Sequence, residues 1–594
     1  MFLPTTIDEA RKLGWNKLDV ILVTGDSYID SPYIGIAVIG KLLYSKGYRV
    51  GIIAQPDVNS PDDIMRLGEP ELFWGVSGGS VDSMVANYTA SKKRRQQDDY
   101  TPGGVNDRRP DRAVIVYANL VRRYFRNTKP IVLGGIEASL RRVTHYDYWD
   151  NKLRRPILFD AKADYLLYGM AEKVVLELAD KLKNNQPAHD VRGLCYISRD
   201  KKQDFVELQS FEACAEDKDT FTDMFRLFYE NNDPVTAKGL YQQTGDRYLV
   251  QNPPQPHPSE RELDSYYELD YERDVHPGLG KAGKVRALDT IRFSITTHRG
   301  CYGECNFCAI AVHQGRTVIS RSPKSILKEA EGFTKNKKFK GVISDVGGPT
   351  ANMYGFECAK KFKSGVCSDK RCVYPETCRT LEPDHRPQIE LLKELRKIQG
   401  VNKVFVASGL RHDLVLEDER HGEEYLRQVV CYHTSGQMKI APEHTDDRVL
   451  ALMGKPGTTS LLEFKELFKR YSRGAGKRQF LTYYFIAAHP GSTDREMLEL
   501  KRYASQQLAI SPEQVQIFTP TPSTWSSLMY YMEKNPFTGE KLFVEKHLSG
   551  KERQKQILTE KWGRPLYKAP GRKQGPKSHR QLNSRRGKGK KYRK

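Results

Sequence analysis

Three closely spaced cysteines constrain this chain more than any other feature of its sequence. Cys301, Cys305 and Cys308 lie in the loop HRGCYGECNFCAI, directly after a predicted β-strand. Gly300 and Gly303 allow the tight backbone turns that three thiolates need in order to reach one small centre. Three protein ligands leave one metal position open, which is typical of a centre where chemistry takes place at the metal. The spacing therefore predicts an iron–sulfur cluster with a chemical role.

Two other metal centres could use the same loop. A zinc ion would need a fourth ligand, which His298 or His313 could supply. A cluster that only carries electrons would need a fourth cysteine at ferredoxin-like spacing, and the loop lacks one. Disulfides are not expected, because seven of the ten cysteines cluster between Cys301 and Cys378 in a long chain without a secretory signal.

The first 185 residues alternate between short apolar strands and helical stretches. This alternation predicts βαβ units and a Rossmann-like parallel sheet over residues 1–185. Ligands of such sheets bind at the carboxyl ends of the strands, where this sequence places glycines. The predicted strands are residues 19–24, 49–54, 73–77, 130–133 and 164–167.

The alternation resumes in the second half and completes an α/β fold. It predicts a partial (βα)6 TIM-like barrel over residues 286–520, with active loops at the carboxyl ends of its strands. Residues 186–285 are predicted to be a connector, and residues 355–385 a cysteine-rich insertion after the second barrel strand. The six predicted barrel strands are residues 291–296, 341–345, 403–407, 437–440, 480–486 and 514–518.

Much of the net charge of +22 lies at the C-terminal end. After an extension at residues 521–567, residues 568–594 hold twelve Lys and Arg and no Asp or Glu, so they contribute +12. This composition predicts a disordered basic tail, which could bind the phosphate backbone of RNA or could serve only solubility. The sequence has no apolar run of about 18 residues, so we expect a cytoplasmic protein with no membrane partner.

The cysteine loop resembles the signature of the radical S-adenosylmethionine (radical SAM) superfamily, in which an aromatic residue, here Phe307, precedes the third cysteine. The stretch SDVGGPT is similar to the glycine-rich motif of that family, although Pro349 replaces the more usual acidic residue. The resemblance implies that the open iron of a 4Fe-4S cluster binds S-adenosylmethionine, whose methionine group meets Gly347 and Gly348. It also implies reductive cleavage to a 5′-deoxyadenosyl radical, with a flavodoxin- or ferredoxin-like electron donor.

Other stretches narrow the resemblance. Residues 437–456 and 487–497 are similar to the barrel of radical SAM methylthiotransferases. Residues 252–280 resemble the YgiQ-type radical SAM proteins, and this likeness extends over the chain to about residue 560. The resemblance implies a fold and a cofactor, but it names no substrate.

Several polar residues lie next to these motifs. Glu443 follows a strand end and could reach the ribose or the amino group of S-adenosylmethionine. His298, His444 and His489 could act as acids or bases near neutral pH, but structural hydrogen bonding is the favoured role for each.

The N-terminal domain resembles the cobalamin-binding type of domain that precedes many radical SAM barrels. Cobalamin bound without its lower base normally needs the histidine of a D-x-H-x-x-G loop. This chain has Asp26 at the first position, but Tyr28 replaces the histidine and Ser31 the glycine. The sequence therefore favours a Rossmann-like domain that covers the barrel mouth without cobalamin.

A second cysteine group lies in the insertion. Four thiols within 21 residues could hold zinc or a second cluster, or they could be free thiols. They are Cys358, Cys367, Cys372 and Cys378. The isolated Cys195, Cys214 and Cys431 are expected to be buried packing residues.

These features favour a radical SAM enzyme whose substrate is RNA or another macromolecule, an expectation that rests on the basic tail and the methylthiotransferase-like barrel. A small-molecule substrate is also compatible with the sequence. The alternative from another class is a non-catalytic RNA-binding protein that zinc or a cluster stabilises.

Overall fold

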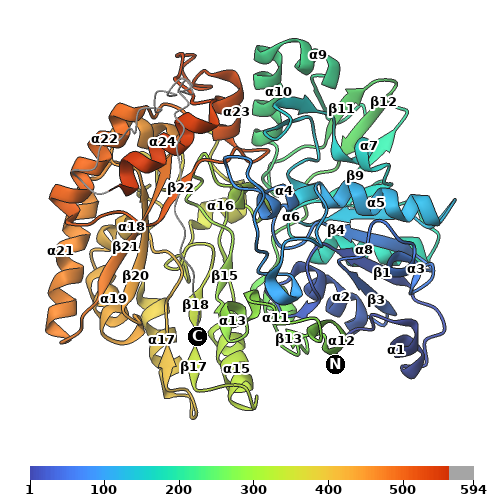
Figure 1. The fold of residues 1–594 in the computed structure, drawn as a ribbon, viewed down its shortest axis with the longest axis horizontal. Coiled ribbons are helices and arrows are strands. Elements are labelled where there is room, and N and C mark those ends of the chain that lie inside the picture. Colours follow the sequence, from blue (N-terminus) through green and yellow to red (C-terminus); the bar gives the residue numbers. More distant parts are fainter. Residues whose placement is uncertain (561–594) are drawn as a thin grey trace, which may run out of the picture. The chain divides into compact units, whose positions relative to one another are not determined.

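The first half of the chain forms one nine-stranded sheet. The computed structural model describes residues 1–560, and the predicted basic tail lies outside the described residues (Figure 1). Five neighbouring strands are parallel, in the order β3-β1-β4-β5-β8. Their bounds are β1 Val20–Thr24, β3 Val50–Ala54, β4 Phe73–Ser77, β5 Ile131–Gly134 and β8 Tyr165–Leu167. This order is that of a flavodoxin-like doubly wound sheet.

Both faces of this sheet are covered, which explains why its strands are apolar throughout. All five residues of β1 are buried. Ile21 and Val23 join the core that contains α5 (Ala113–Tyr124), whereas Val20 and Leu22 join the core that contains α2 (Gly35–Ser45) and α8 (Glu172–Lys183). Successive side chains of a strand point to opposite faces, so α5 covers one face and α2 and α8 cover the other.

Four more strands extend the sheet beyond β8, in the order β8-β9-β12-β11-β10. They are β9 Leu194–Ser198, β10 Val206–Leu208, β11 Leu240–Thr244 and β12 Arg247–Gln251, and β9 is antiparallel to β8. The sequence predicts a connector over residues 186–285. The structure contradicts this for residues 194–251, whose four strands belong to the N-terminal sheet. Strands such as β11 (LYQQT) carry polar side chains, so their apolar pattern is weak.

The second half is a partial βα barrel, as predicted. Its parallel pairs are β14 (Ser294–Thr296) with β18 (Asp345–Gly347), β17 (Val342–Ile343) with β19 (Lys403–Val404), and β20 (Gln437–Glu443) with β21 (Phe480–Ala487) and β22 (Val515–Ile517). A parallel β-bridge between Leu410, in the segment that follows β19, and Ile440 of β20 links these two neighbouring parts of the barrel. Each of the six predicted strand regions thus contains a strand.

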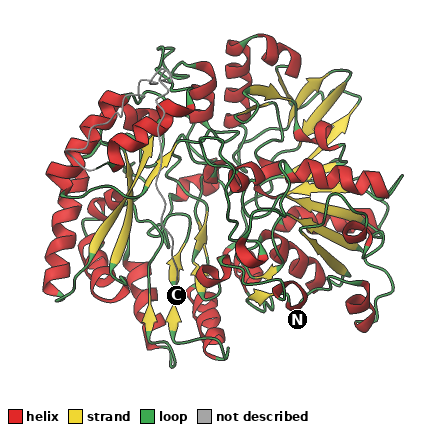
Figure 2. Ribbon diagram, viewed as in Figure 1, coloured by secondary structure: helices red, strands yellow, loops and turns green. Residues whose placement is uncertain are grey.

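Helices cover the outer side of the barrel, shown in red in Figure 2. They are α15 Pro323–Thr334, α17 Arg386–Lys397, α19 Gly422–Gln428, α21 Thr459–Gly474 and α22 Asp494–Tyr503. Within residues 1–560, no helix has both the length and the apolar character that a membrane crossing requires.

Candidate active site

The three cysteines lie in a loop that leaves the barrel directly after β15 (His298–Arg299) and ends at the short helix α14 (Ile310–His313). Gly300 has a φ of +81°, and a Cβ there would lie 2.0 Å from the carbonyl oxygen of Thr317. Only glycine fits this turn, which holds the loop against the segment that returns to β16 (Ile319–Ser320).

A cavity of about 190 Å³ opens beside the three cysteines. Its walls come from four different parts of the barrel: the cysteine loop, Pro349 and Thr350 after β18, residues 409–413 after β19, and residues 441–444 at the carboxyl end of β20. The carboxyl ends of the strands therefore converge on one site, as expected for such barrels.

The space between the sulfurs fits a cluster better than a single zinc ion. A Cβ at Gly303 would lie 3.2 Å from the Cys301 Sγ and 3.9 Å from the Cys305 Sγ, so glycine keeps the space between these sulfurs open. Sulfurs bound to one zinc ion at 2.3 Å lie roughly 3.8 Å apart. Within residues 1–560, the one group of three potential ligand atoms closer than 4.8 Å to one another contains no cysteine.

Neither histidine considered as a fourth zinc ligand lines the cysteine cavity. His298 and His313 instead line a second, larger cavity.

Burial raises the pKa of the Cys308 thiol to about 12, so a bound metal would have to displace its proton.

Arg411 supplies a positive charge to this site, and the sequence alone did not single it out. Its Nη1 lies 3.1 Å from the Cβ position at Gly303, next to the sulfurs of Cys301 and Cys305. Its Nε donates to Asp413 at 3.0 Å, and the guanidinium holds the pKa of this carboxyl below its usual range although burial opposes the shift. The stretch SGLRHD after the third predicted strand was the available signal.

Glu443, predicted to follow a strand end, is instead the last residue of β20, and it lines the cysteine cavity. Burial raises the pKa of its carboxyl to about 7, and Lys455, with its Nζ 3.9 Å from the Glu443 Oε1, opposes that rise. Glu443 has a φ of +69°, an uncommon backbone conformation for a non-glycine residue, which is often found at functional sites.

The His298 ring leaves no room for a side chain at Gly348. A Cβ at Gly348 would lie 2.5 Å from the Nε2 of His298. The His298 side chain is fully buried, and its Nδ1 lies 2.9 Å from the Thr297 Oγ1. Burial lowers its pKa to about 4, so the ring is neutral and packs against the glycine motif as a positioning group.

His444 and His489 are also fully buried. The Nδ1 of His444 accepts from the Asp446 backbone at 3.0 Å, and the Nε2 of His489 lies 2.7 Å from the Ser526 Oγ. Burial lowers the pKa of His444 to about 4 and that of His489 to about 3. Both rings are held in structural hydrogen bonds.

Comparison with known proteins identifies the family. Residues 2–294 match the family model described as Radical SAM N-terminal, and residues 295–504 match that of the Radical SAM superfamily. The chain belongs to the radical SAM superfamily. It is 60% identical over 561 residues to a UPF0313 protein of Fusobacterium nucleatum, with 94% of this chain and 99% of the relative covered. A UPF0313 protein of Thermotoga neapolitana is 50% identical over 568 residues, with 95% and 100% covered. The radical SAM chain is thus a UPF0313, or YgiQ-type, protein.

Two solved structures are similar to this radical SAM protein. The radical S-adenosylmethionine methyltransferase TsrM from Kitasatospora setae, with cobalamin and a [4Fe-4S] cluster bound, has a TM-score of 0.48 and 15% identity over 86% of this chain and 77% of its own. The cobalamin-dependent S-adenosylmethionine radical enzyme OxsB, with aqua-cobalamin and S-adenosylmethionine bound, has a TM-score of 0.48 and 13% identity over 93% of this chain and 57% of its own.

The histidine position of the cobalamin-type loop directs no side chain into either cavity, although Asp26 of the same loop lines the larger one. Tyr28, at the histidine position, is fully buried, and its hydroxyl accepts from the Leu3 backbone at 3.2 Å. Asp26 is held by Arg109, whose Nη2 lies 2.7 Å from the Asp26 Oδ1 and 3.0 Å from the Asp98 Oδ2. These residues do not fit the usual histidine ligation of cobalamin.

The second cysteine group is only partly brought together. The sulfurs of Cys358 and Cys378 lie 3.7 and 3.2 Å from the Thr380 Oγ1. Burial raises the pKa of Cys372 to about 11, although Lys361 opposes the rise. Cys367 is half-buried, and its metal content, like that of the whole group, stays a prediction.

The isolated cysteines differ from one another. Cys195 and Cys214 are buried in the N-terminal core, as expected. Cys431 is only half-buried, unlike its neighbours Val429 and Val430 in the π-helical turn Val429–His433 that follows α19.

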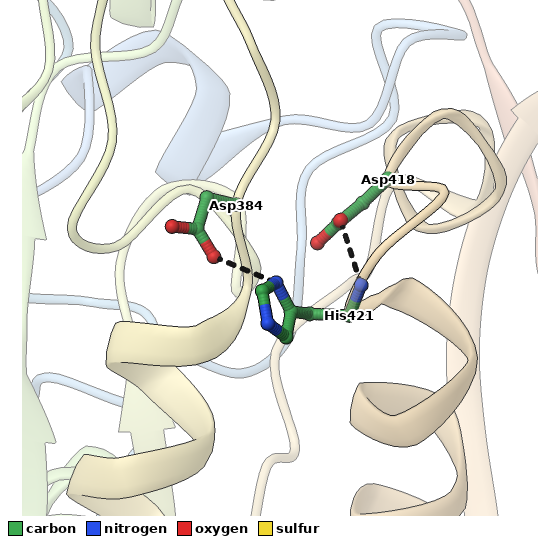
Figure 3. Close-up of side chains that lie close together, drawn as sticks. All are labelled: Asp384, Asp418 and His421. Carbon is green, nitrogen blue, oxygen red and sulfur yellow. Dashed lines mark hydrogen bonds and ion pairs between the residues drawn. The ribbon is translucent and has the colours of Figure 1, made fainter.

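The tightest group of potential ligands in residues 1–560 consists of Asp384, Asp418 and His421. Figure 3 shows the His421 ring directed at Asp384, whereas Asp418 accepts from the His421 backbone. Asp418 also accepts from the Nδ1 of the buried His385 at 2.9 Å. The carboxylates are thus already used to fasten the end of the cysteine-rich insertion to α17 and α19.

Proposed function

We propose that this radical SAM enzyme binds a 4Fe-4S cluster through Cys301, Cys305 and Cys308 and cleaves S-adenosylmethionine reductively. One observation carries the proposal: the three cysteines, the segment after β18 and Glu443 line one cavity. That arrangement supports three cluster ligands with one metal position left open, beside Pro349 and Thr350 at the end of the glycine motif.

When bound, the cluster and S-adenosylmethionine together supply a one-electron cleavage that gives methionine and a 5′-deoxyadenosyl radical, which takes a hydrogen atom from the substrate. The chain's own residues would hold and orient the cluster and S-adenosylmethionine. Gly347 and Gly348 line the adjoining larger cavity where it meets Pro349, and they would allow close approach of the backbone to the methionine group at that boundary. Arg411 offsets the negative charge of the thiolates, and Glu443 offers a polar contact to the bound cofactor.

The proposal includes partners outside the chain. The electron comes from an external donor, for which a flavodoxin- or ferredoxin-like protein of the cytoplasm is suited. The twelve basic residues of the tail, 568–594, support binding of RNA. We further propose that the N-terminal domain works without cobalamin, because Tyr28 is turned away from both cavities.

The test is anaerobic reconstitution with iron and sulfide, followed by reduction in the presence of S-adenosylmethionine. We expect 5′-deoxyadenosine from the wild-type protein and none from the Cys301→Ala, Cys305→Ala or Cys308→Ala variants, which also lose iron. Cys431→Ala is the matched control, since this half-buried thiol lies outside the cysteine cavity. A protein with an intact cluster that forms no 5′-deoxyadenosine would contradict the proposal. A colourless zinc protein that binds RNA would favour the non-catalytic alternative.

A further inference from the structure

A second cavity, of about 440 Å³, lies between the N-terminal sheet and the barrel. On one side it is lined by residues at the carboxyl ends of strands β1, β4, β5 and β8, including Thr24, Ser77 and Gly134. On the other side it is lined by the ends of β14 and β18, including Thr296 and Gly347. The carboxyl ends of both sheets therefore face the same space, where α/β proteins bind their ligands.

This cavity adjoins the cysteine cavity. Ile310, which follows the cysteine loop, and Pro349, which follows the glycine motif, line both of them. A molecule in the larger cavity would thus lie next to the place where the proposed function generates its radical. The larger cavity has the right position for the substrate.

We infer that the larger cavity is the substrate site and that its substrate is a small, neutral and largely apolar molecule. That the occupant is a substrate rests on the proposed function. The presence of the cavity and the kind of molecule it fits do not depend on that function. The chemical class follows from the charges, the apolar walls and the volume.

The carboxylates that line the cavity already have partners. Glu172 accepts from the Arg299 Nη1 at 2.5 Å, and Asp26 accepts from the buried Arg109. Asp345 accepts from the backbone nitrogens of Ala407 and Ser408 at 2.7 and 3.1 Å. Glu172 and Asp26 are thus bonded to arginines, and Asp345 is held by neutral backbone donors, so none of the three carboxylates lacks a partner within the protein. A charged ligand would find no free counter-charge among them and would be costly to bury.

The rest of the wall combines apolar side chains with a few donors. The apolar residues include Ile34, Ile36, Ile39, Val76, Leu133, Met170 and Val175. Hydroxyl, imidazole and amide side chains lie between them, including Tyr33, Ser77, His313 and Gln314. Helices α2 and α8 both begin at this cavity, and within residues 1–560 no side chain caps either N-terminus. Their first backbone N–H groups can therefore bind a carbonyl or hydroxyl oxygen of the ligand.

The volume limits what can enter. About 440 Å³ falls within the usual range of small-molecule sites, roughly 300–1,000 Å³. The walls come from two packed domains, so a macromolecule could insert no more than one residue or base. We therefore favour a free small molecule over the RNA that the basic tail indicates.

Two glycines allow the cavity to be filled without a backbone clash. Among the described residues, no heavy atom lies within 4 Å of a Cβ added to Gly134 or Gly35, and both line the cavity. Gly332 on α15 has the same free space but lies outside both cavities, which makes Gly332→Leu the matched control.

The first experiment measures binding of Nile red, a neutral apolar dye, to the anaerobically reconstituted protein by fluorescence. We expect Gly134→Leu and Gly35→Leu each to weaken binding about tenfold or more, a loss of at least ~1.4 kcal/mol, and Gly332→Leu to bind as the wild type does. Wild-type affinity in both cavity variants would overturn the site. Stronger binding of the anionic dye 8-anilinonaphthalene-1-sulfonate at the same place would overturn the neutral class.

The second experiment measures 5′-deoxyadenosine formation after addition of cell-extract fractions separated by molecular mass. We expect the low-mass fraction to stimulate the wild type and Gly332→Leu, but not Gly134→Leu. Stimulation by the macromolecular fraction alone, abolished by ribonuclease or protease, would overturn the small-molecule substrate. If an intact cluster gives no 5′-deoxyadenosine, the proposed function fails and the claim of a substrate fails with it, while the dye results still decide the cavity.

Discussion

Replacement of Gly348 by alanine tests whether His298 holds the glycine motif in place. The added Cβ would lie 2.5 Å from the His298 Nε2, whereas ordinary contacts are 3.4–4 Å, so the ring must move by roughly 1 Å. The ring has little room for this, because it is fully buried and bonded to Thr297. Overpacking of this kind costs about 1–3 kcal/mol. We expect a loss of this size in the free energy of unfolding.

The assay combines chemical denaturation with calorimetric titration of S-adenosylmethionine, both on anaerobically reconstituted protein. Because the clash displaces the backbone of the glycine motif, Gly348→Ala should also bind S-adenosylmethionine more weakly. Gly332→Ala, with free space around its Cβ inside helix α15, should leave binding unchanged and should raise the free energy of unfolding by about 0.4–1 kcal/mol, not lower it. Adding His298→Ala to Gly348→Ala removes the clashing ring and should restore binding. Wild-type behaviour of Gly348→Ala, or a double variant that binds no better than the single one, would refute the reasoning.

Three other perturbations follow from the structure and sequence. If the second cysteine group holds a cluster, the variant with Cys358 and Cys378 replaced by alanine should contain up to four fewer irons per protein and keep the cluster of the cysteine loop. Elemental analysis measures this difference, and an unchanged iron content would indicate free thiols. Burial lowers the pKa of Lys551 to about 7, so the unfolded chain binds more protons than the folded chain between pH 7 and about 10.5. The free energy of unfolding should therefore rise with pH in this window. Chemical denaturation at several pH values should show a flatter pH profile for Lys551→Met than for the exposed-site control Lys397→Met. Truncation before Ala569 should weaken RNA binding and its salt dependence, and an unchanged salt slope in filter binding would contradict a role of the tail.

The regular parts of the fold were readable from the sequence because their signals are local. The run VILVT of β1 is buried on both faces, and a strand of that kind has no polar residue to obscure it. β11 and β12 were missed for the opposite reason: they lie toward the end of the sheet, and polar side chains such as Gln242 and Gln243 interrupt their apolar pattern. What decides their place is pairing with a distant strand, which periodicity does not show.

The same distinction applies to the site. Cys301, Cys305 and Cys308 are close in sequence, so their spacing alone predicts a shared centre. Arg411 lies about a hundred residues further along the chain and reaches the sulfurs only because two strand ends meet in the barrel. The contact between His298 and Gly348 likewise joins neighbouring strands, and neither residue by itself indicates it.

The two cavities draw differently on the two halves of the chain. The cysteine cavity is built by residues of the barrel alone, whereas the larger cavity also needs the strand ends of the N-terminal sheet. If the proposed function holds, the barrel could keep its cofactor residues unchanged while the N-terminal wall would determine what reaches the radical. Since Ile310 and Pro349 line both cavities, the cofactor and the substrate would meet across these two side chains. Pro349, which departs from the acidic residue usual in the family motif, adds no charge at this boundary, in keeping with a neutral substrate.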